Sequence, residues 1–586
     1  MQEGEKAPPR RSWLRRFRWI IVLVGLFLLW FFWWRGPSVP DPAVLTIDIS
    51  APVPERTDGF LSVLDLEGSF DLLKLRRAVV AAGEDRRIRG ILVRAGAAGI
   101  AWAQAEEIRE LLENFRRRGK FVVGFGRGPD GAGYFLLSAA SHVVLDPAAE
   151  LQLLGIGLRP VFFGEALRSI GIEFDLVRAG EAKGTYEQLR SGSASPELKR
   201  TFEETADALY GAVVAKISAA RRISPEEVRL AIDDAPISPA RALKAKLADR
   251  VAYADELPDL LATLCGGEKP RAIDAETYVQ AVGEGSGGTK VAVIHASGVL
   301  ADAGAGFVPF LGRIQGVDEI RAAVRQARED PEVKGILLRI DSPGGTTSAA
   351  ERLWREVEVT RKVKPVVASM GGVAASGGYY IACGAEWTVA HPTTITGSIG
   401  VFGGKLEASK LMERLQIRSE IYSRGRRAGL HDWMRPMSDD ERTAMERTVQ
   451  EIYRLFLDRV AVGRKKPFEE AERLARGRIW TGKQAQEHGL VDDLGGMETA
   501  IAKLRELAKL RESEIVDLVP RPPRRSMLDA LRRAPADSPA GFFSPSPSVG
   551  FPAEEVDSMR LLQTISDLIE RGGGTFSLLP YHLLLR

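Results

Sequence analysis

The sequence predicts an α/β protein with two tandem modules preceded by one transmembrane helix. Three observations lead to this prediction. Short β-branched runs alternate with amphipathic helical stretches, the same motifs return at a fixed distance along the chain, and an unbroken apolar tract lies near the start. At 586 residues, the chain has room for about four domain-sized units of ~150 residues.

The apolar tract runs from Trp19 to Trp34, and five of the chain's ten tryptophans lie before residue 35. As a helix it spans about 24 Å, slightly less than the ~30 Å of a bilayer core. Basic residues precede it: Lys6, Arg10, Arg11, Arg15, Arg16 and Arg18. They predict that residues 1–18 are cytoplasmic and that the chain after a membrane anchor at 19–35 lies across the membrane. A cleaved signal peptide is the alternative, but residues 35–40 offer no small-x-small cleavage site.

The internal repeat defines the two modules. Gly90-Ile-Leu-Val-Arg94 returns as Gly335-Ile-Leu-Leu-Arg339, an offset of 245 residues. Further pairs keep this offset or one of 243: Gly133 with Gly378, Tyr134 with Tyr379, Pro147 with Pro392, Gly155 with Gly400, Leu247 with Leu490 and Asp249 with Asp492. Unrelated sequences would not keep a nearly constant offset over so many residues, so we expect related modules at about 43–265 and 290–510.

Within the second module the pattern is β-α-β, which predicts mostly parallel strands. The expected strands are 290–295, 335–340, 365–369 and 387–390, and the expected helices are 317–328, 348–362 and, much longer, about 439–462. The first module has a counterpart of the long helix near 197–221.

Two segments read as connections. Residues 266–289 are predicted to be a Gly-rich linker between the modules. Residues 511–586 are predicted to be a proline-rich tail with one short helix between residues 556 and 570, and the sequence assigns this tail no function.

The composition excludes several function classes. Lys and Arg number 81 and Asp and Glu 78, so the net charge of +3 argues against nucleic-acid binding. Two distant cysteines, Cys265 and Cys383, provide neither a disulfide framework nor a cysteine zinc site. The six histidines form no HExxH or similar cluster, and we expect no metal and no cofactor. A Ser-His-Asp triad stays open, although no GxSxG motif supports it.

Two glycine-rich stretches are candidates for chemistry. Asp341-Ser-Pro-Gly-Gly345 follows an expected strand and predicts a tight turn with free N-H groups. Ser369-Met-Gly-Gly-Val-Ala-Ala-Ser-Gly-Gly-Tyr379 predicts a strand, a glycine-rich turn and a helix starting near Ser376. A serine at that position, with the N-H groups of Gly345 and Gly377 as an oxyanion hole, would suit acyl transfer. The alternative is that the glycines only allow close helix-strand packing.

The motifs DSPGG, SMGGVAASGGYYIA and TGSIGVFG, together with the repeat and the anchor, closely resemble the long, double-repeat form of the signal peptide peptidase A family. That family consists of membrane-bound serine proteases with a ClpP/crotonase-like fold, and the resemblance covers roughly residues 43–510. It implies that Ser376 is the nucleophile and that Lys183, within Val177-Arg-Ala-Gly-Glu-Ala-Lys183-Gly-Thr-Tyr-Glu-Gln188, is the general base. It also implies that Ser398 orients the lysine, although a turn-capping serine is an equal alternative.

The repeat offers an independent check. The position 245 residues before Ser376 is Gly131, and the position 245 residues after Lys183 is Ala428. The first module therefore lacks the nucleophile and the second lacks the base. If both groups are required, one competent site is built across the two modules.

The resemblance implies a complete activity. A buried, neutral lysine takes the proton from the serine, an acyl-enzyme forms, and water hydrolyses it. The implied substrates are cleaved signal peptides and other unfolded peptides, met by a homotetramer on the outer side of the bacterial cytoplasmic membrane. Three alternatives stay open: a related Ser-Lys protease that cuts membrane-protein tails as a stomatin partner, a crotonase-type acyl-CoA enzyme, and an inactive membrane scaffold.

Overall fold

The computed structural model describes residues 37–56, 70–283, 287–302, 306–308, 312–511, 514–522 and 575–578. The anchor expected at 19–35 and the helix expected between 556 and 570 lie outside these ranges. Among the described residues, no helix combines the length and the apolar character needed to cross a membrane.

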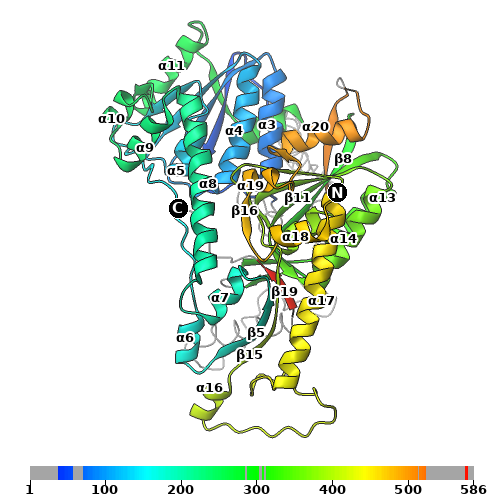
Figure 1. Ribbon diagram of the computed structural model, residues 1–586. Coiled ribbons are helices and arrows are strands. Elements are labelled where there is room, and N and C mark those ends of the chain that lie inside the picture. Colours follow the sequence, from blue (N-terminus) through cyan, green and yellow to red (C-terminus); the bar gives the residue numbers. More distant parts are fainter. Residues whose placement is uncertain are drawn as a thin grey trace, which may run out of the picture.

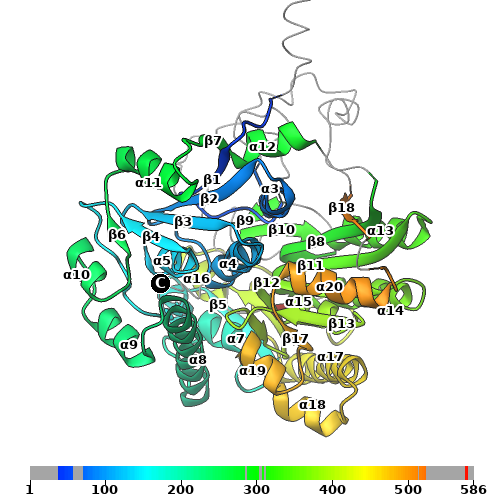
Figure 2. The ribbon, with the colours of Figure 1, turned by 90° about the horizontal axis from the view of Figure 1, so that it is seen from above.

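The first module is built on a six-stranded parallel sheet, in the order β6-β4-β3-β2-β1-β7 (Figure 2). Helices α3 (Leu72–Glu84) and α4 (Trp102–Arg117) connect its first strands in β-α-β fashion. The strands are β1 (Ala43–Ile49), β2 (Ile88–Ala95), β3 (Phe121–Gly126), β4 (His142–Leu145), β6 (Arg250–Val251) and β7 (Arg271–Asp274).

The second module contains the same six parallel strands within a larger sheet of thirteen. Its parallel strands pair in the order β17-β13-β12-β11-β8-β18, the counterpart of β6-β4-β3-β2-β1-β7. The strands are β8 (Thr289–Ala301), β11 (Val333–Thr346), β12 (Val366–Ala375), β13 (Trp387–Ala390), β17 (Asp493–Leu494) and β18 (Val516–Arg521). Helices α13 (Val317–Glu329) and α14 (Thr347–Arg361) connect them. The expected alternation of strands and helices is confirmed.

The sheets extend further along the chain than the sequence pattern indicates. Strand β7 and helix α12 (Ala275–Val282) occupy part of the stretch 266–289, which is therefore not a plain linker. Asp274 caps α12 by accepting a hydrogen bond from the backbone N-H of Thr277. Likewise β18 lies beyond residue 510 and adds the last parallel strand beside β8, so the second module's sheet continues into the predicted tail. Both strands are edge strands of four to six residues, too short to stand out in a sequence.

The duplication extends to single hydrogen bonds. Tyr134 donates its buried hydroxyl to the carbonyl of Leu247, and Tyr379 donates to that of Leu490, both at 2.8 Å. The long helices α8 (Pro196–Arg221) and α17 (Asp439–Arg464) also correspond, since each begins at a capping serine and ends at a residue with left-handed backbone angles. The sequence offsets therefore mark equivalent positions in space.

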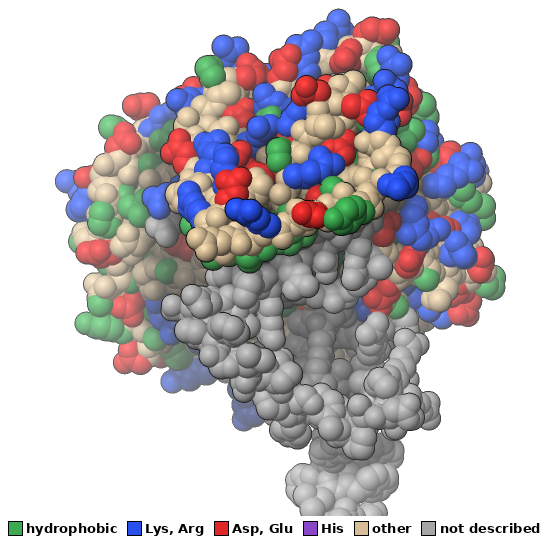
Figure 3. Space-filling model, turned by 90° about the horizontal axis from the view of Figure 1, so that it is seen from below, with side chains coloured by type: hydrophobic (Ala, Val, Ile, Leu, Met, Phe, Trp, Pro, Cys, Tyr) green, Lys and Arg blue, Asp and Glu red, His purple; other side chains and the backbone are tan. Residues whose placement is uncertain are grey.

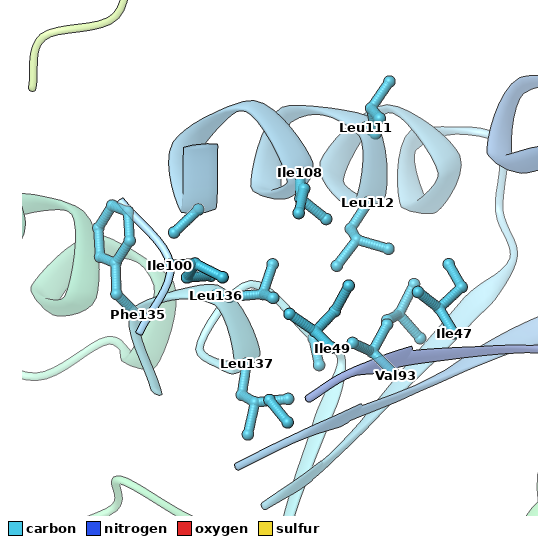
Figure 4. Close-up of a cluster of buried hydrophobic side chains, with 14 of the residues drawn as sticks. Ile47, Ile49, Val93, Ile100, Ile108, Leu111, Leu112, Phe135, Leu136 and Leu137 are labelled. Carbon is cyan, nitrogen blue, oxygen red and sulfur yellow. The ribbon is translucent and has the colours of Figure 1, made fainter. Parts of the chain in front are cut away.

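The two modules share a continuous core. In the first module, Ile108 and Leu112 of α4 point toward the sheet residues Ile49 and Val93 (Figure 4). The same buried cluster includes side chains from β8, β11 and β12 and from α20 (Met497–Leu507) of the second module. Burial of this apolar surface fixes the modules against each other.

A strand from the first half of the chain joins the sheet of the second module and strengthens the junction. Strand β5 (Glu173–Ala179), which belongs to the first half of the chain, pairs antiparallel with β15 (Val401–Glu407) of the second half (Figure 1). The ladder runs from Val401 opposite Ala179 to Glu407 opposite Glu173. It carries the chain just after β5, including Lys183, into the second module.

The surface has mixed charge. Seen from below, Lys and Arg side chains are interspersed with Asp and Glu over the described part of that face (Figure 3). This agrees with the near-neutral net charge of +3 and gives no single-sign field on this face for a nucleic acid.

The Tyr379 hydroxyl gives a stability prediction. Tyr379→Phe leaves the carbonyl of Leu490 without its buried donor, so we expect a loss of about 1–3 kcal/mol of stability and a lower Tm by calorimetry. Tyr422→Phe is the control because the Tyr422 side chain is 86% exposed. Equal Tm values for the two variants would contradict the structural role of the buried hydroxyl.

Candidate active site

Ser376 lies directly after β12 and before the short helix α15 (Gly377–Ala382), and it is fully buried. Its backbone angles, φ 55° and ψ −116°, are unusual for a residue with a side chain. Its N-H donates to the carbonyl of Gly397 at 2.7 Å, at the end of β14 (Ile395–Gly397). Strained backbone of this kind is typical of functional sites, and here the fold holds it in place.

The tight turn predicted at Pro343 to Gly345 is wrong. These residues continue β11, and the ladder with β8 resumes after a shift in register, with Gly344 opposite Val299 and Gly345 opposite Leu300. Gly344 permits the irregularity, since its φ is +120°.

The prediction of a glycine-rich turn before Ser376 is wrong as well, because these residues form a bulge within β12. The register between β11 and β12 shifts after Ile340, and the residues 371–373 bulge out of the ladder. Asp341 holds this bulge by accepting a hydrogen bond from the N-H of Val373 at 3.0 Å. Burial raises the pKa of Asp341 to about 6.

Lys183 follows β5 and precedes α7 (Gly184–Arg190), and its side chain is fully buried. The N-H of the preceding Ala182 donates to the carbonyl of Arg476 in the second module at 2.8 Å. A Cβ on Gly477 would lie 2.6 Å from the backbone nitrogen of Lys183, so only glycine permits this close approach of the two backbones. The lysine backbone is thus docked on the second module.

The Lys183 amine is surrounded by three hydroxyl or carbonyl groups. Nζ lies 2.6 Å from Ser376 Oγ, 3.0 Å from the Ser398 carbonyl oxygen and 3.2 Å from Ser398 Oγ. A neutral amine has two N-H donors and one lone pair, so in that form it can donate to both Ser398 oxygens and accept a hydrogen bond from the Ser376 hydroxyl. Burial alone lowers the pKa of Lys183 well below its usual value, which favours this neutral form.

Gly345 and Gly377 lie side by side next to Ser376. A Cβ on Gly377 would lie 3.1 Å from the Gly345 nitrogen, and a Cβ on Gly345 would lie 1.9 Å from the Leu300 carbonyl oxygen. Gly345 therefore has no room for a larger residue, and Gly377 is tightly packed. The sequence's candidates, Ser376, Lys183, Ser398, Gly345 and Gly377, are therefore all gathered at one place.

The backbone of a distant segment runs past this place. Strand β19 (Thr575–Leu578) pairs antiparallel with Gly344 to Thr346 of β11 and with Phe402 and Gly403 of β15. An extended chain therefore fits between β11 and β15, beside the Gly345 backbone.

Sequence reasoning missed the groups that support the site. The Gly397 carbonyl and the Asp341 carboxylate act on the backbone around Ser376, and no motif marks such contacts. Glu187, the acidic residue near Lys183, faces away from the amine. It accepts hydrogen bonds from Ser195 and pairs with Arg178 at 2.9 Å.

One group of side chains has the composition of a metal site. Glu107, Glu110 and His391 place ligand atoms within 4.8 Å of one another. The guanidinium of Arg339 lies 2.8 Å from Glu107, and both carboxylates already accept backbone N-H groups. The positive charge beside Glu107 opposes a cation, so the group fits an ion-pair network better than a metal centre.

Comparison with known proteins identifies the family. The model of peptidase family S49 matches twice, at residues 114–266 and 358–511. The chain belongs to peptidase family S49. The S49 domain thus occurs once in each half, in agreement with the internal repeat.

Two relatives extend along most of the chain. "Serine protease SPPA, chloroplastic" of Arabidopsis thaliana is 31% identical over 514 residues, covering 86% of this chain and 74% of that protein. "Protease 4" of Salmonella typhi is 31% identical over 530 residues, covering 86% of this chain and 84% of that protein. An SppA signal peptide peptidase of Enterococcus faecium is 33% identical over 238 residues, covering 40% of this chain and 68% of that protein. This S49 protein is a serine protease, which disfavours the acyl-CoA enzyme and the inactive scaffold.

The packing at Gly345 gives a testable prediction. Gly345→Ala forces the Leu300 backbone away, so we expect labelling of the enzyme by a fluorophosphonate to slow at least about 100-fold. Gly211→Ala is the control, because a Cβ at that position on α8 would meet no atom within 4 Å apart from the adjacent backbone of its own helix. Labelling of Gly345→Ala at the rate of Gly211→Ala would contradict the packing argument.

Proposed function

We propose that this S49 protein is a membrane-anchored serine endopeptidase that uses a Ser376-Lys183 dyad to degrade cleaved signal peptides. One observation carries the proposal: Lys183 Nζ lies 2.6 Å from Ser376 Oγ, with both side chains fully buried. That distance is within the reach of direct proton transfer. The lowered pKa of Lys183 supplies a neutral base next to the hydroxyl.

The reaction follows from these positions. Nζ of neutral Lys183 accepts the Ser376 proton as Oγ attacks the carbonyl carbon of the scissile peptide bond. The N-H groups of Gly345 and Gly377 stabilise the oxyanion, and the ammonium returns the proton to the leaving amine. Water, deprotonated by the same amine, then hydrolyses the acyl-enzyme. Ser398 keeps the lysine aimed at Oγ through its two oxygens.

The peptide would bind as an added strand. The backbone of β19 pairs between β11 and β15, and an extended substrate could form the same main-chain hydrogen bonds. This mode favours unfolded peptides over folded proteins. The name of the Enterococcus faecium relative supports signal peptides as the substrate class.

The membrane setting is part of the proposal. The apolar tract from Trp19 to Trp34 and the basic residues before it support an anchor with a cytoplasmic N-terminus. The two modules would then act on the outer side of the bacterial cytoplasmic membrane, where released signal peptides are found. The homotetramer expected from the family resemblance stays a prediction.

Cleavage of a synthetic signal peptide tests the dyad. We expect Ser376→Ala and Lys183→Met each to lower kcat at least about 1,000-fold, because each removes a group that takes part in bond cleavage. Lys405→Met is the matched control, since Lys405 is also buried but donates to the Asp432 carbonyl. Wild-type rates in Ser376→Ala or Lys183→Met would refute the mechanism, and faster cleavage of a folded protein would refute the substrate class.

The pH dependence tests the state of the lysine. Only neutral Lys183 is active, so kcat/KM should rise with pH through its lowered pKa and level off well below pH 10.5. Asp341, with a pKa of about 6, titrates in the acid range and can add a second step to the pH profile of kcat/KM. Asp341→Asn removes that step and leaves the one due to Lys183. A midpoint near pH 10.5 would contradict the buried base.

A further inference from the structure

Helix α4 of the first module has two opposite faces. Its residues Ile108 and Leu112 point toward the first sheet (Figure 4), whereas Glu106, Glu107 and Glu110 contact residues of the second module. In Figure 2, α4 lies between the first sheet and β12, close to α20. The acidic face therefore reaches the second module.

Each of the three carboxylates contacts the second module. Glu106 Oε2 accepts hydrogen bonds from the Thr393 hydroxyl at 2.7 Å and from the Thr393 N-H at 3.3 Å. Glu107 contacts His391 Nε2 at 3.2 Å, and Glu110 accepts the N-H of Gly496 at 2.8 Å. Glu106 and Glu107 thus hold the two sides of the turn at residues 391–394. Glu107 also accepts the Met497 N-H, and Glu110 binds only the start of α20 among these partners.

That turn leads directly to the active site. After Thr394 come the three residues of β14 and then Ser398, whose oxygens bind Lys183. Gly397, at the end of β14, accepts the Ser376 N-H. The Thr393 and Ser398 side chains are 2% and 0% exposed, so close packing transmits a displacement at Thr393 to Ser398.

We propose that Glu106 is a positioning residue for the reaction, acting through Thr393 and β14 on the Ser398 hydroxyl and hence on Lys183. This inference rests on the proposed Ser-Lys mechanism. The first module thereby contributes to the site twice. It supplies the base directly through Lys183, and it sets the lysine's hydrogen-bond partner from the opposite side through α4.

The repeat supports a specific role for this acidic face. The positions 245 residues after Glu106, Glu107 and Glu110 are Glu351, Arg352 and Arg355 on α14. Glu351 binds Tyr380 and Arg459 within its own module, and Arg352 pairs with Asp302 and Asp318. The acidic residues at positions 107 and 110 are therefore not required by the fold of a module. Position 106 keeps a glutamate in both modules and differs in its partner, since Glu351 binds within its own module and Glu106 binds Thr393 across the junction.

The charges at the junction explain why carboxylates serve here. Buried Arg339 forms two 2.8 Å bonds with Glu55 and one with Glu107, and His391 Nε2 lies 3.2 Å from the same Glu107 oxygen. Lys216 lies 3.7 Å from Glu106 Oε1. Opposite charges thus surround the carboxylates, and the hydrogen bonds to them are charge-assisted and specific in direction.

A double-mutant cycle tests the positioning role. The readout is the rate at which a fluorophosphonate acylates Ser376, measured per folded molecule. We expect Glu106→Met to slow acylation about tenfold in the wild-type background and less than about twofold in the Ser398→Ala background, since its effect passes through Ser398. Glu106→Gln keeps an acceptor for Thr393 and should restore most of the rate.

Two further variants keep the test decisive. Thr393→Val removes the hydroxyl from the other side of the contact and should reproduce the loss without adding to Glu106→Met. Glu110→Met, on the same helix face but bound to α20, should change acylation less than about twofold in either background. If Glu106→Met slows acylation equally in the wild-type and the Ser398→Ala backgrounds, the inference is overturned.

The same assay separates the two proposals. If Ser376→Ala is acylated like the wild type, the proposed function fails. If Ser376→Ala is not acylated, while the effects of Glu106→Met and Ser398→Ala on the acylation rate add up in the double mutant, only the positioning role fails.

Discussion

The contact between Lys183 and Ser376 is the constraint on which the rest of the structure depends. A lysine serves as a base only when it is neutral, and burial is the one cause that lowers its pKa here. Burial in turn requires that the chain after β5 be sealed between the modules. The β5-β15 ladder, the shared core and the approach of Lys183 to Gly477 together provide that seal. A looser junction would admit water and restore the charge.

The duplication explains the length of the chain. The six parallel strands of each module have the same order, and equivalent tyrosines make the same buried hydrogen bond. Yet Gly131 stands where the second module has Ser376, and Ala428 stands where the first has Lys183. Two copies of one fold have thus become unlike at the positions that matter for chemistry, and their junction holds one candidate site.

Much of this was predictable from the sequence, because repetition and hydrophobic periodicity are local signals. The 245-residue offset located both modules, and the offset of Ser376 and Lys183 indicated that one site joins them. The sequence could not show that Pro343 to Gly345 continue a strand, since the bulge depends on pairing with Val299 and Leu300. Nor could it show that β7 and β18 complete the sheets, because an edge strand is defined by its neighbour. Glu106 was also beyond reach, since its partner Thr393 lies in the other module.

The state of Lys183 tests the account most directly. NMR of the enzyme with 13C-labelled lysine, with the Lys183 signal assigned by its absence in Lys183→Arg, gives the pKa of this amine itself. The account predicts a value well below the usual 10.5, as expected for a fully buried amine between Ser376 and Ser398. A Lys183 signal that titrates near 10.5 would mean that the amine is charged at working pH, and it would contradict the neutral base.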